Sequence, residues 1–425
     1  IDTVVALVRA HLADRPVVVC SAHAGVTDLL LEGARKAAAG EPDLEPIRAR
    51  EHEVLRGLNL KTTLVDDELD RLGQMFEGLS LLGELTPRSL DTVAAFGERM
   101  SVKAIAAVLR RRRIPATAVM ADEAGMVTDC RYGRATPLPA CYQNLKRSIQ
   151  RVDGVPVVTG FIGRDEEGNV TTLGRSGSDF TATIVGRAVA AKEVQIWTDV
   201  SGVLTADPRI VADARPVEEL TYAEASELAY YGAKVIHPAT IQPAIEKGIP
   251  VRILNTMDPD ARGTQIAPAR GKAGGTAVAS IASKRGILLV NIVSGRMLGQ
   301  SGFMASVFEA FQRHDVVVDL IATSEVSVTV SVDAWDGIRD VVRELDQIAQ
   351  VDVEEGNALV AVIGERMRQA SGLTGLVFGA VSDAGVPIRG ISYGATKTNL
   401  QLVVPEKRLE ETVRALHDAL FPALD

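Results

Sequence analysis

The chain has 425 residues, which is too many for a single hydrophobic core and predicts two or three domains. Its formal net charge of −9 argues against general nucleic-acid binding, because a basic face is the usual electrostatic footprint of nucleic-acid-binding proteins. No apolar run approaches the roughly 18 residues that cross a bilayer, so we expect no membrane span.

The first part of the chain alternates strand and helix signals. It begins at Ile1, directly in a helical pattern, and we interpret it as a cut sequence. A buried strand is predicted over residues 16–20, followed by a turn of small residues. Charges and leucines at helical spacing predict a helical insertion over residues 31–90. A long amphipathic helix is expected from Asp91 to the arginine run that ends at Arg113.

A glycine-rich stretch that follows the strand predicted at residues 155–162 has the composition of an anion-binding turn. It reads Gly174-Arg-Ser-Gly-Ser-Asp179 and leads into a helical pattern. Ser178 or Asp179 is predicted to cap this helix, whose free N–H groups and dipole favour a bound anion. Arg175 supplies a planar fork for a carboxylate or a phosphate. The alternative is an ordinary strand–turn–helix connection with a capping serine.

Two further strands are predicted over residues 194–200 and 249–255, with a turn-rich connection and a helix between them. Thr221, followed three residues later by Glu224, is a capping-box arrangement that predicts the start of the helix. Strands that alternate with helices up to residue 256 indicate a three-layer α/β domain with a mainly parallel sheet.

An internal repeat follows residues 257–280, whose Gly, Ala and Pro content predicts a linker or a loosely packed crossover. Similar segments begin at Gly302 and Gly372, 70 positions apart, and the same offset aligns apolar positions beyond them. Each copy has a βαββαβ order, which is ferredoxin-like. The last strand is clear only in the first copy, at residues 351–353, and the second copy is predicted to begin with a strand over residues 359–363.

Several segments of residues 16–266 resemble the amino acid kinase family, and specifically aspartokinases. They include Phe96-Gly-Glu-Arg-Met-Ser101, the stretch from Thr172 to Asp179, and the run from Ala225 to Pro238. The paired repeats resemble the two ACT domains that sense an end-product amino acid in that family. The resemblance implies an amino acid kinase domain over residues 1–266, a linker over 267–280, and ACT domains over 281–356 and 357–425.

The reaction that this resemblance implies is transfer of the γ-phosphoryl of ATP to the side-chain carboxylate of L-aspartate. The product is 4-phospho-L-aspartate, the first step towards lysine, threonine and methionine. A carboxylate with a pKa of about 3.9 is already ionised at pH 7, so no general base is needed. The site must bring two anions together in line and neutralise the developing charge. ATP and Mg²⁺ are the implied cofactors, with Mg²⁺ bridging the phosphates and no protein metal ligand assigned.

Individual residues take roles through the same resemblance. Arg175 is expected to hold the α-carboxylate of aspartate, while Glu98, with Asp179 nearby, holds its ammonium group. Further substrate contacts are expected from Ser21, Thr27 and Ser178. Nucleotide contacts are expected from Thr198, Asp199, Leu204, Arg209, Lys234 and Val235.

The first repeat resembles the lysine-sensitive branch of the family, which implies feedback inhibition by lysine. Asp319 and Glu325 are expected to bind the ammonium groups of lysine, and Ser324 its carboxylate end. The effector site is also expected to include Met297, Phe303 and Met304. Because ACT domains tend to pair their sheets across subunits, the resemblance implies a homodimer or a higher homo-oligomer.

The sequence departs from the family pattern at several positions. The family's amino-terminal Lys-Phe-Gly-Gly-Thr-Ser strand and loop, with its phosphate-binding lysine, is absent, and we expect a severe loss of catalysis if the polypeptide lacks it. Leu204 stands where the family often has a tyrosine beside the nucleotide. Ser176 replaces a usual glycine and His23 replaces a small residue, and both are in positions to modify the pocket.

Two alternatives to an aspartokinase remain open from the sequence. One is a non-catalytic, amino-acid-sensing regulatory protein that keeps the kinase fold and the ACT pair. The other is a kinase of the same fold that acts on glutamate or N-acetylglutamate, against which the Phe96-Gly-Glu-Arg segment and the ACT pair argue.

Metal-binding and redox signals are weak. Cys20, Cys130 and Cys141 follow no metal-ligand spacing, and the six histidines are scattered. This cysteine usage predicts structural thiols in a reduced, cytoplasmic protein.

Overall fold

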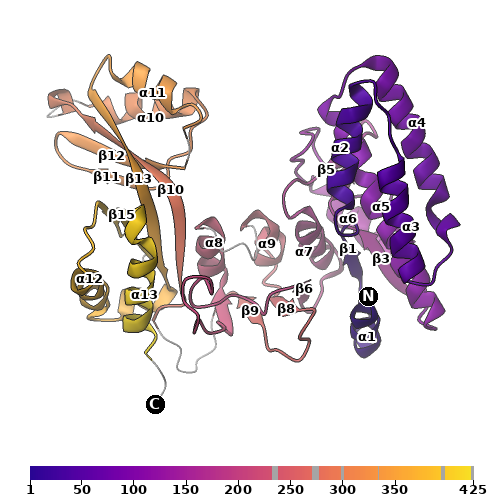
Figure 1. Cartoon of the computed structure of the whole chain (residues 1–425). Coiled ribbons are helices and arrows are strands. Elements are labelled where there is room, and N and C mark those ends of the chain that lie inside the picture. The colour runs from indigo at the N-terminus through magenta and orange to yellow at the C-terminus, as the bar shows by residue number, and fades with distance from the viewer. Residues whose placement is uncertain (232–237, 270–276, 298–300, 334, 394–397, 423–425) are drawn as a thin grey trace. The chain divides into compact units, whose positions relative to one another are not determined.

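The computed structural model describes residues 1–231, 238–269, 277–297, 301–333, 335–393 and 398–422 (Figure 1). The chain divides into two compact units. One consists of Ile1–Val200 and Ile236–Ala261, and the other of Ser201–Val235 and Arg262–Asp425. None of the helices in the described residues combines the length and the apolar character that a membrane span requires.

The first unit is a mixed α/β structure. Its helices are α1 (Asp2–Ala10), α2 (Val26–Ala38), α3 (Glu45–Gly57), α4 (Asp66–Leu82), α5 (Pro87–Arg111), α6 (Ala140–Ile149), α7 (Gly177–Val189) and α9 (Pro238–Ile245). Its strands are β1 (Val18–Cys20), β2 (Ala116–Val119), β3 (Val155–Thr159), β4 (Ile162–Arg164), β5 (Val170–Thr172), β6 (Val194–Thr198) and β8 (Val251–Asn255).

Parallel pairing dominates this unit, as the sequence predicts. Strands β1 and β2 both pair in parallel with β3, and β6 pairs in parallel with β8. Every residue of β3 is buried, which suits a central strand covered on both faces. Strands β4 and β5 form a separate antiparallel pair that leads into α7.

The predicted helical insertion is present as α2, α3 and α4, which pack with α5 around Leu30, Leu72 and Phe76. The long amphipathic helix predicted with Asp91 near its start is α5, which begins four residues earlier, at Pro87. Thr86 caps it by accepting a hydrogen bond from the Ser89 N–H at 3.1 Å, and proline is well suited to a first helical turn.

The second unit contains the remaining elements. They are β7 (Glu219–Thr221), α8 (Tyr222–Tyr230), β9 (Thr264–Ala267), β10 (Ser280–Val293), α10 (Phe303–Arg313), β11 (Ile321–Thr323), β12 (Ser327–Val332), α11 (Ile338–Leu345), β13 (Gln350–Ile363), α12 (Leu373–Asp383), β14 (Gly390–Ser392), β15 (Asn399–Pro405) and α13 (Leu409–Leu420). The capping box predicted for α8 is confirmed. The Thr221 N–H donates to Glu224 at 2.8 Å, and the Glu224 N–H donates to the Thr221 hydroxyl oxygen at 3.2 Å.

The two repeats share one antiparallel sheet of order β11-β12-β10-β13-β15-β14. The long strands β10 and β13 each pass through both repeats. Residues 288–293 of β10 pair with β12, and residues 289–293 also pair with residues 350–354 in the first half of β13, whereas residues 280–284 pair with residues 359–363 in its second half. The start of β13 therefore belongs to the sheet of the first copy, whereas residues 280–284, at the start of β10, supply the strand that the sequence of the second copy did not reveal.

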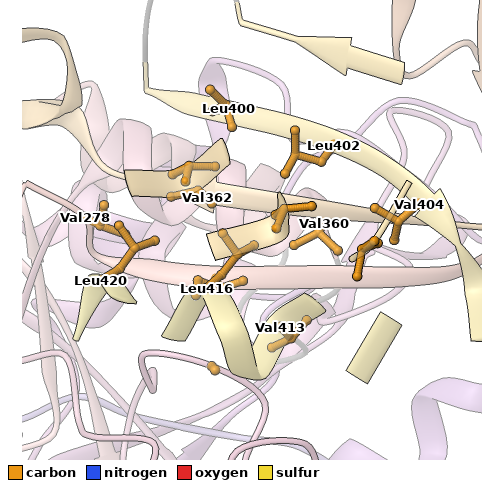
Figure 2. Packing of buried hydrophobic residues seen from close by; sticks show 14 of the residues in the cluster. Val278, Val360, Val362, Leu400, Leu402, Val404, Val413, Leu416 and Leu420 are labelled. Atoms are coloured by element: carbon orange, nitrogen blue, oxygen red, sulfur yellow. The ribbon is translucent and has the colours of Figure 1, made fainter. Parts of the chain in front are cut away.

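The separate strands predicted at residues 351–353 and 359–363 are thus one strand, and the division at residue 356 falls inside it. Figure 1 shows β10 and β13 side by side, with α10 and α11 near one end and α12 and α13 near the other. Helix α13 covers the sheet with Val413 and Leu416, which pack with Val360 and Leu402 (Figure 2).

Candidate active site

A cavity of about 320 Å³ lies in the first unit, beside the residues that follow β1 and β3. Its lining comes from segments far apart in sequence: the loop after β1, the first turn of α2, the middle of α5, the residue before β4, and the loop that starts α7. The lining residues are Ser21, Thr27, Glu98, Phe161, Gly174, Ser176, Gly177, Ser178 and Asp179. All the predicted substrate residues except Arg175 therefore meet at this one cavity.

Glu98 is the most deeply buried carboxylate of the cavity, with an exposed fraction of 3%. A Cβ at its neighbour Gly97 would lie 2.7 Å from the Cβ of Ala22, so glycine lets the loop after β1 approach α5. The Ala22 N–H donates to Oε1 of Glu98 at 3.2 Å, and Oε2 has no hydrogen-bond partner in the described part of the chain. Burial raises the pKa of Glu98 to about 7, and the hydrogen bond offsets this only in part.

The loop that starts α7 places two more polar side chains at the cavity. The N-cap of α7 is Ser176, whose side chain makes no capping hydrogen bond, so the prediction that Ser178 or Asp179 caps this helix was wrong. Ser176 has a φ of 54°, and this left-handed backbone turns the chain into the helix. Ser178 and Asp179 therefore lie in the first helical turn and line the cavity, and burial raises the pKa of Asp179.

The glycine that is usual in the family at position 176 suits this positive φ, which serine adopts at a steric cost. Arg175 stands between Gly174 and Ser176, both of which have positive φ. Its side chain is exposed and does not line the cavity, and it forms no ion pair with the described residues.

Asp91 anchors the segment that leads into this loop. Its carboxylate accepts hydrogen bonds from the Thr172 N–H, the Thr172 hydroxyl and the Gly133 N–H, each at 2.8 Å. Asp91 itself is buried, with an exposed fraction of 4%. The carboxylate therefore joins α5 to the end of β5, two residues before Gly174.

Asp91→Ala is expected to lower the free energy of unfolding of the first unit by about 3 kcal/mol, because it leaves buried N–H and hydroxyl donors without an acceptor. Urea unfolding followed by far-UV circular dichroism measures this loss. Asp91→Asn, which keeps one acceptor oxygen, is expected to lose less. A loss below about 0.5 kcal/mol for the alanine variant would show that water replaces the carboxylate.

His23 does not line the cavity. Its Nδ1 lies 3.0 Å from Oε2 of Glu51, a fully buried carboxylate on α3. The side chain that departs from the family pattern thus fastens the loop after β1, which carries Ser21, to the helical insertion.

The predicted nucleotide residues lie in different parts of the chain. Thr198 ends β6 and its hydroxyl donates to Asp199, which is exposed. Leu204 is half-buried, and its carbonyl accepts a hydrogen bond from the Ser280 hydroxyl at 2.7 Å. The Arg209 guanidinium is exposed and pairs with Asp207 at 2.6 Å, a partner that the sequence did not suggest. Lys234 and Val235 lie outside the described residues.

The predicted effector residues all belong to the first repeat, but they divide into separate groups. Met297, Phe303 and Met304 are partly buried against the core under α10 and α11. Ser324 and Glu325 are exposed in the turn between β11 and β12, where Ser324 accepts the N–H groups of Val326 and Ser327. Asp319 lies at the other end of β11.

Asp319 already has partners within the chain. Its side chain has an exposed fraction of 2%, the Tyr230 hydroxyl donates to Oδ1, and the Lys284 ammonium lies 3.6 Å from Oδ2. Lys284 also pairs with Asp333. The pKa of Asp319 is raised to about 7, mainly because the carboxyl is buried and to a smaller extent because the Asp333 carboxylate lies nearby.

Among the described residues, no three side chains of His, Cys, Asp or Glu come together in a group that would hold a metal ion. Mg²⁺ in nucleotide-dependent enzymes is commonly held by substrate phosphates with only one or two protein carboxylates. The exposed carboxylate of Asp199, at the end of a parallel strand, is compatible with that mode.

Comparison with known proteins gives matches over nearly the whole chain. The model of the amino acid kinase family matches residues 1–255, and an ACT domain model matches residues 290–347 and 360–420. The chain is 36% identical to the chloroplastic aspartokinase 3 of Arabidopsis thaliana over 98% of its length and 78% of that protein. It is 37% identical to the lysine-sensitive aspartokinase 3 of Escherichia coli, over 95% of its length and 92% of that protein.

Solved structures of Escherichia coli aspartokinase III share the fold. The complex with aspartate and ADP, described as the R-state, aligns with a TM-score of 0.81 at 35% identity, covering 99% of this chain and 96% of the other. The complex of the same protein with lysine and aspartate, described as the T-state, aligns with a TM-score of 0.79 and also covers 99% of this chain and 96% of the other.

Proposed function

The chain belongs to the amino acid kinase family, among its aspartokinases, and we propose that it transfers the γ-phosphoryl group of ATP to the side-chain carboxylate of L-aspartate. The observation that carries the substrate assignment is the buried carboxylate of Glu98, which lines the cavity with one oxygen lacking a partner among the described residues. A buried carboxylate gains most from a cationic hydrogen-bond donor. The ammonium group of an amino acid supplies that donor.

The remaining groups of aspartate find partners around Glu98. Asp179 adds a second carboxylate near the ammonium group, and the hydroxyl groups of Ser21, Thr27 and Ser178 add neutral donors. Arg175 is assigned to the α-carboxylate, which it reaches by closing over the cavity. Its guanidinium is exposed and has no ion-pair partner among the described residues, so no internal ion pair has to break for this contact to form. A volume of about 320 Å³ is at the small end of ligand pockets and suits one small amino acid.

Nucleotide binding to this chain is supported by the similar Escherichia coli enzyme, whose structure holds ADP. We assign ATP to Thr198, Asp199, Leu204, Arg209, Lys234 and Val235, with Mg²⁺ bridging its phosphates. Mg²⁺ supplies charge neutralisation on the transferring phosphoryl group when it is bound. The enzyme's own contribution is to hold the ionised aspartate carboxylate in line with that group.

Hydroxylamine trapping tests this function, because an acyl phosphate such as 4-phospho-L-aspartate reacts with hydroxylamine to give a hydroxamate. The full-length gene product, incubated with ATP, Mg²⁺ and L-aspartate, is expected to form the hydroxamate. Glutamate and N-acetylglutamate are expected to be poor substrates. Preference for either of them would assign the chain to a different substrate, and the absence of turnover with all three would favour an amino-acid-sensing protein without catalysis.

Lysine is the proposed feedback inhibitor, supported by similarity to the lysine-sensitive enzyme and to its complex with lysine. We assign its ammonium groups to Asp319 and Glu325 and its carboxylate to Ser324, and we assign Met297, Phe303 and Met304 to the same effector site. In the conformation described, a lysine ammonium has to compete with Lys284 and Tyr230 for Asp319. We also propose a cytoplasmic homodimer or higher homo-oligomer formed through the ACT domains.

Glu325→Ala is expected to raise the half-inhibitory concentration of lysine at least tenfold, because it removes an exposed carboxylate that would pair with an ammonium group. Inhibition curves at fixed aspartate and ATP measure this shift. Glu355→Ala, at another exposed glutamate of the second unit, is the matched control and is expected to leave the curve unchanged. An unchanged curve for Glu325→Ala would remove this residue from the effector site.

A further inference from the structure

Phe161, which no sequence pattern marked as a site residue, has an unusual backbone at the wall of the cavity. Its φ is 63°, in the left-handed region that bulky side chains rarely adopt. It immediately precedes β4 and lines the cavity together with Glu98 and Ser178. A strained backbone persists only where the surrounding structure enforces it, and such residues cluster at functional sites.

The restraint on Phe161 comes from Thr181, which is fully buried on α7. The Phe161 N–H donates to the Thr181 hydroxyl oxygen at 3.0 Å, and this hydroxyl donates in turn to the Gly177 carbonyl at 2.9 Å. One hydroxyl thus uses its donor and an acceptor site to join the residue before β4 to the first turn of α7. On the other side, the Phe161 carbonyl accepts the Leu173 N–H at 2.8 Å.

The packing around this hydrogen bond leaves little space. A Cβ at Gly160 would lie 2.4 Å from the Ser178 hydroxyl oxygen, and a Cβ at Gly177 would lie 2.6 Å from the Phe161 ring. The Gly160 backbone therefore lies directly against Ser178, and the Gly177 backbone lies directly against the Phe161 ring. A change in the Phe161 backbone would be transmitted directly to Ser178, whose neighbour Asp179 also lines the cavity.

We propose that Thr181 is a positioning residue for the amino-acid substrate, acting through the left-handed backbone of Phe161. This inference rests on the proposed phosphorylation of aspartate, but Thr181 is not one of the residues assigned to contact the substrate. Without its hydroxyl, the Phe161 N–H loses its acceptor and the positive φ loses its restraint. Phe161 then relaxes, and the cavity wall that it forms with Ser178 shifts.

The test uses Thr181→Val, which keeps the shape of the side chain and removes the hydroxyl, and Thr181→Ser, which keeps the hydroxyl. Thr181→Val is expected to raise KM for aspartate about tenfold or more while KM for ATP stays within twofold. Thr181→Ser is expected to stay within threefold of the wild type. Thermal melting of each variant identifies any general loss of folding, which would move both KM values and kcat together.

A second background isolates the backbone mechanism. Glycine adopts positive φ without strain, so Phe161→Gly removes the need for the Thr181 restraint. Phe161→Gly is expected to change KM for aspartate by itself, so the double variant is compared with Phe161→Gly and not with the wild type. In that comparison, adding Thr181→Val is expected to change KM for aspartate by less than twofold. This loss of additivity is the signature of two residues that act as one unit.

The outcomes separate the two proposals. If the wild type does not phosphorylate aspartate, the proposed function fails. If the wild type is active and Thr181→Val behaves like it, or if Thr181→Val costs the same in the Phe161→Gly background, the positioning role is overturned. A Thr181→Ser variant as impaired as Thr181→Val would also overturn it, because the hydroxyl would not be the group that matters.

Discussion

Arg175→Ala is expected to lower kcat/KM for aspartate about 100-fold, which corresponds to roughly 3 kcal/mol of transition-state stabilisation. The guanidinium is the cation that we assign to the substrate α-carboxylate, and a bidentate fork is difficult to replace. Arg175→Lys keeps the charge without the fork, and we expect a loss of about tenfold. Steady-state kinetics with aspartate varied at saturating ATP measure both effects.

Arg147→Ala is the matched control, since Arg147 is an exposed arginine of the same unit on α6, away from the cavity lining. It is expected to stay within twofold of the wild type. If Arg175→Ala raised KM for ATP and left KM for aspartate unchanged, the arginine would serve the nucleotide, and the α-carboxylate would need another partner.

Glu98→Gln is expected to lower kcat/KM for aspartate about 100-fold or more, because it removes the buried charge that pairs with the substrate ammonium group. The amide fills almost the same space, so the cavity keeps its shape. KM for ATP is expected to change little. A loss of less than threefold would show that the ammonium group binds elsewhere, with Asp179 as the nearest candidate.

The pH dependence follows from the pKa of about 7 for Glu98 in the free protein. Burial favours the protonated form, whereas an ammonium group binds the ionised form. The wild-type kcat/KM for aspartate is therefore expected to rise as pH increases through about 7 and to level off above it, since this parameter reports the free enzyme. Glu98→Gln has no such group, so this limb of the profile is expected to disappear.

Much of the candidate site followed from the sequence, but through resemblance rather than periodicity. Periodicity predicted the amphipathic helix that carries Glu98 but gave this residue no role. The resemblance assigned Glu98 to the substrate, and the structure adds the physical reason: a buried carboxylate with an oxygen that lacks a partner among the described residues. Such a reason depends on packing between α5 and the loop after β1, which are far apart in sequence.

Other features depended on backbone conformation that residue types do not reveal. Serine and aspartate at positions 178 and 179 are good capping residues, yet α7 begins after a left-handed Ser176 and carries both of them inside its first turn. Phe161 has a positive φ although phenylalanine disfavours it. In both cases the tertiary packing of the loop before β4 against α7 overrides the local preference.

The shared sheet of the repeats was missed for a similar reason. Separate strands were predicted at residues 351–353 and 359–363, on either side of Glu354-Glu355-Gly356-Asn357, whose composition is typical of a turn. In the structure β13 continues through these residues, and the irregularity appears as shifts in its register with β10 near Ile287. Apart from the buried Asn357, these polar residues remain at least partly exposed, so the chain does not have to turn to solvate them.

Glu98 is proposed to select aspartate by its ammonium group, and a comparison of aspartate with succinate isolates this selection. Succinate is aspartate without the amino group, so phosphoryl transfer to the two acids in wild type and Glu98→Gln isolates the contact between Glu98 and the ammonium group. The wild type is expected to prefer aspartate strongly, and Glu98→Gln is expected to lose most of that preference by losing activity towards aspartate alone. An equal loss towards both acids, or an unchanged preference, would contradict the assignment.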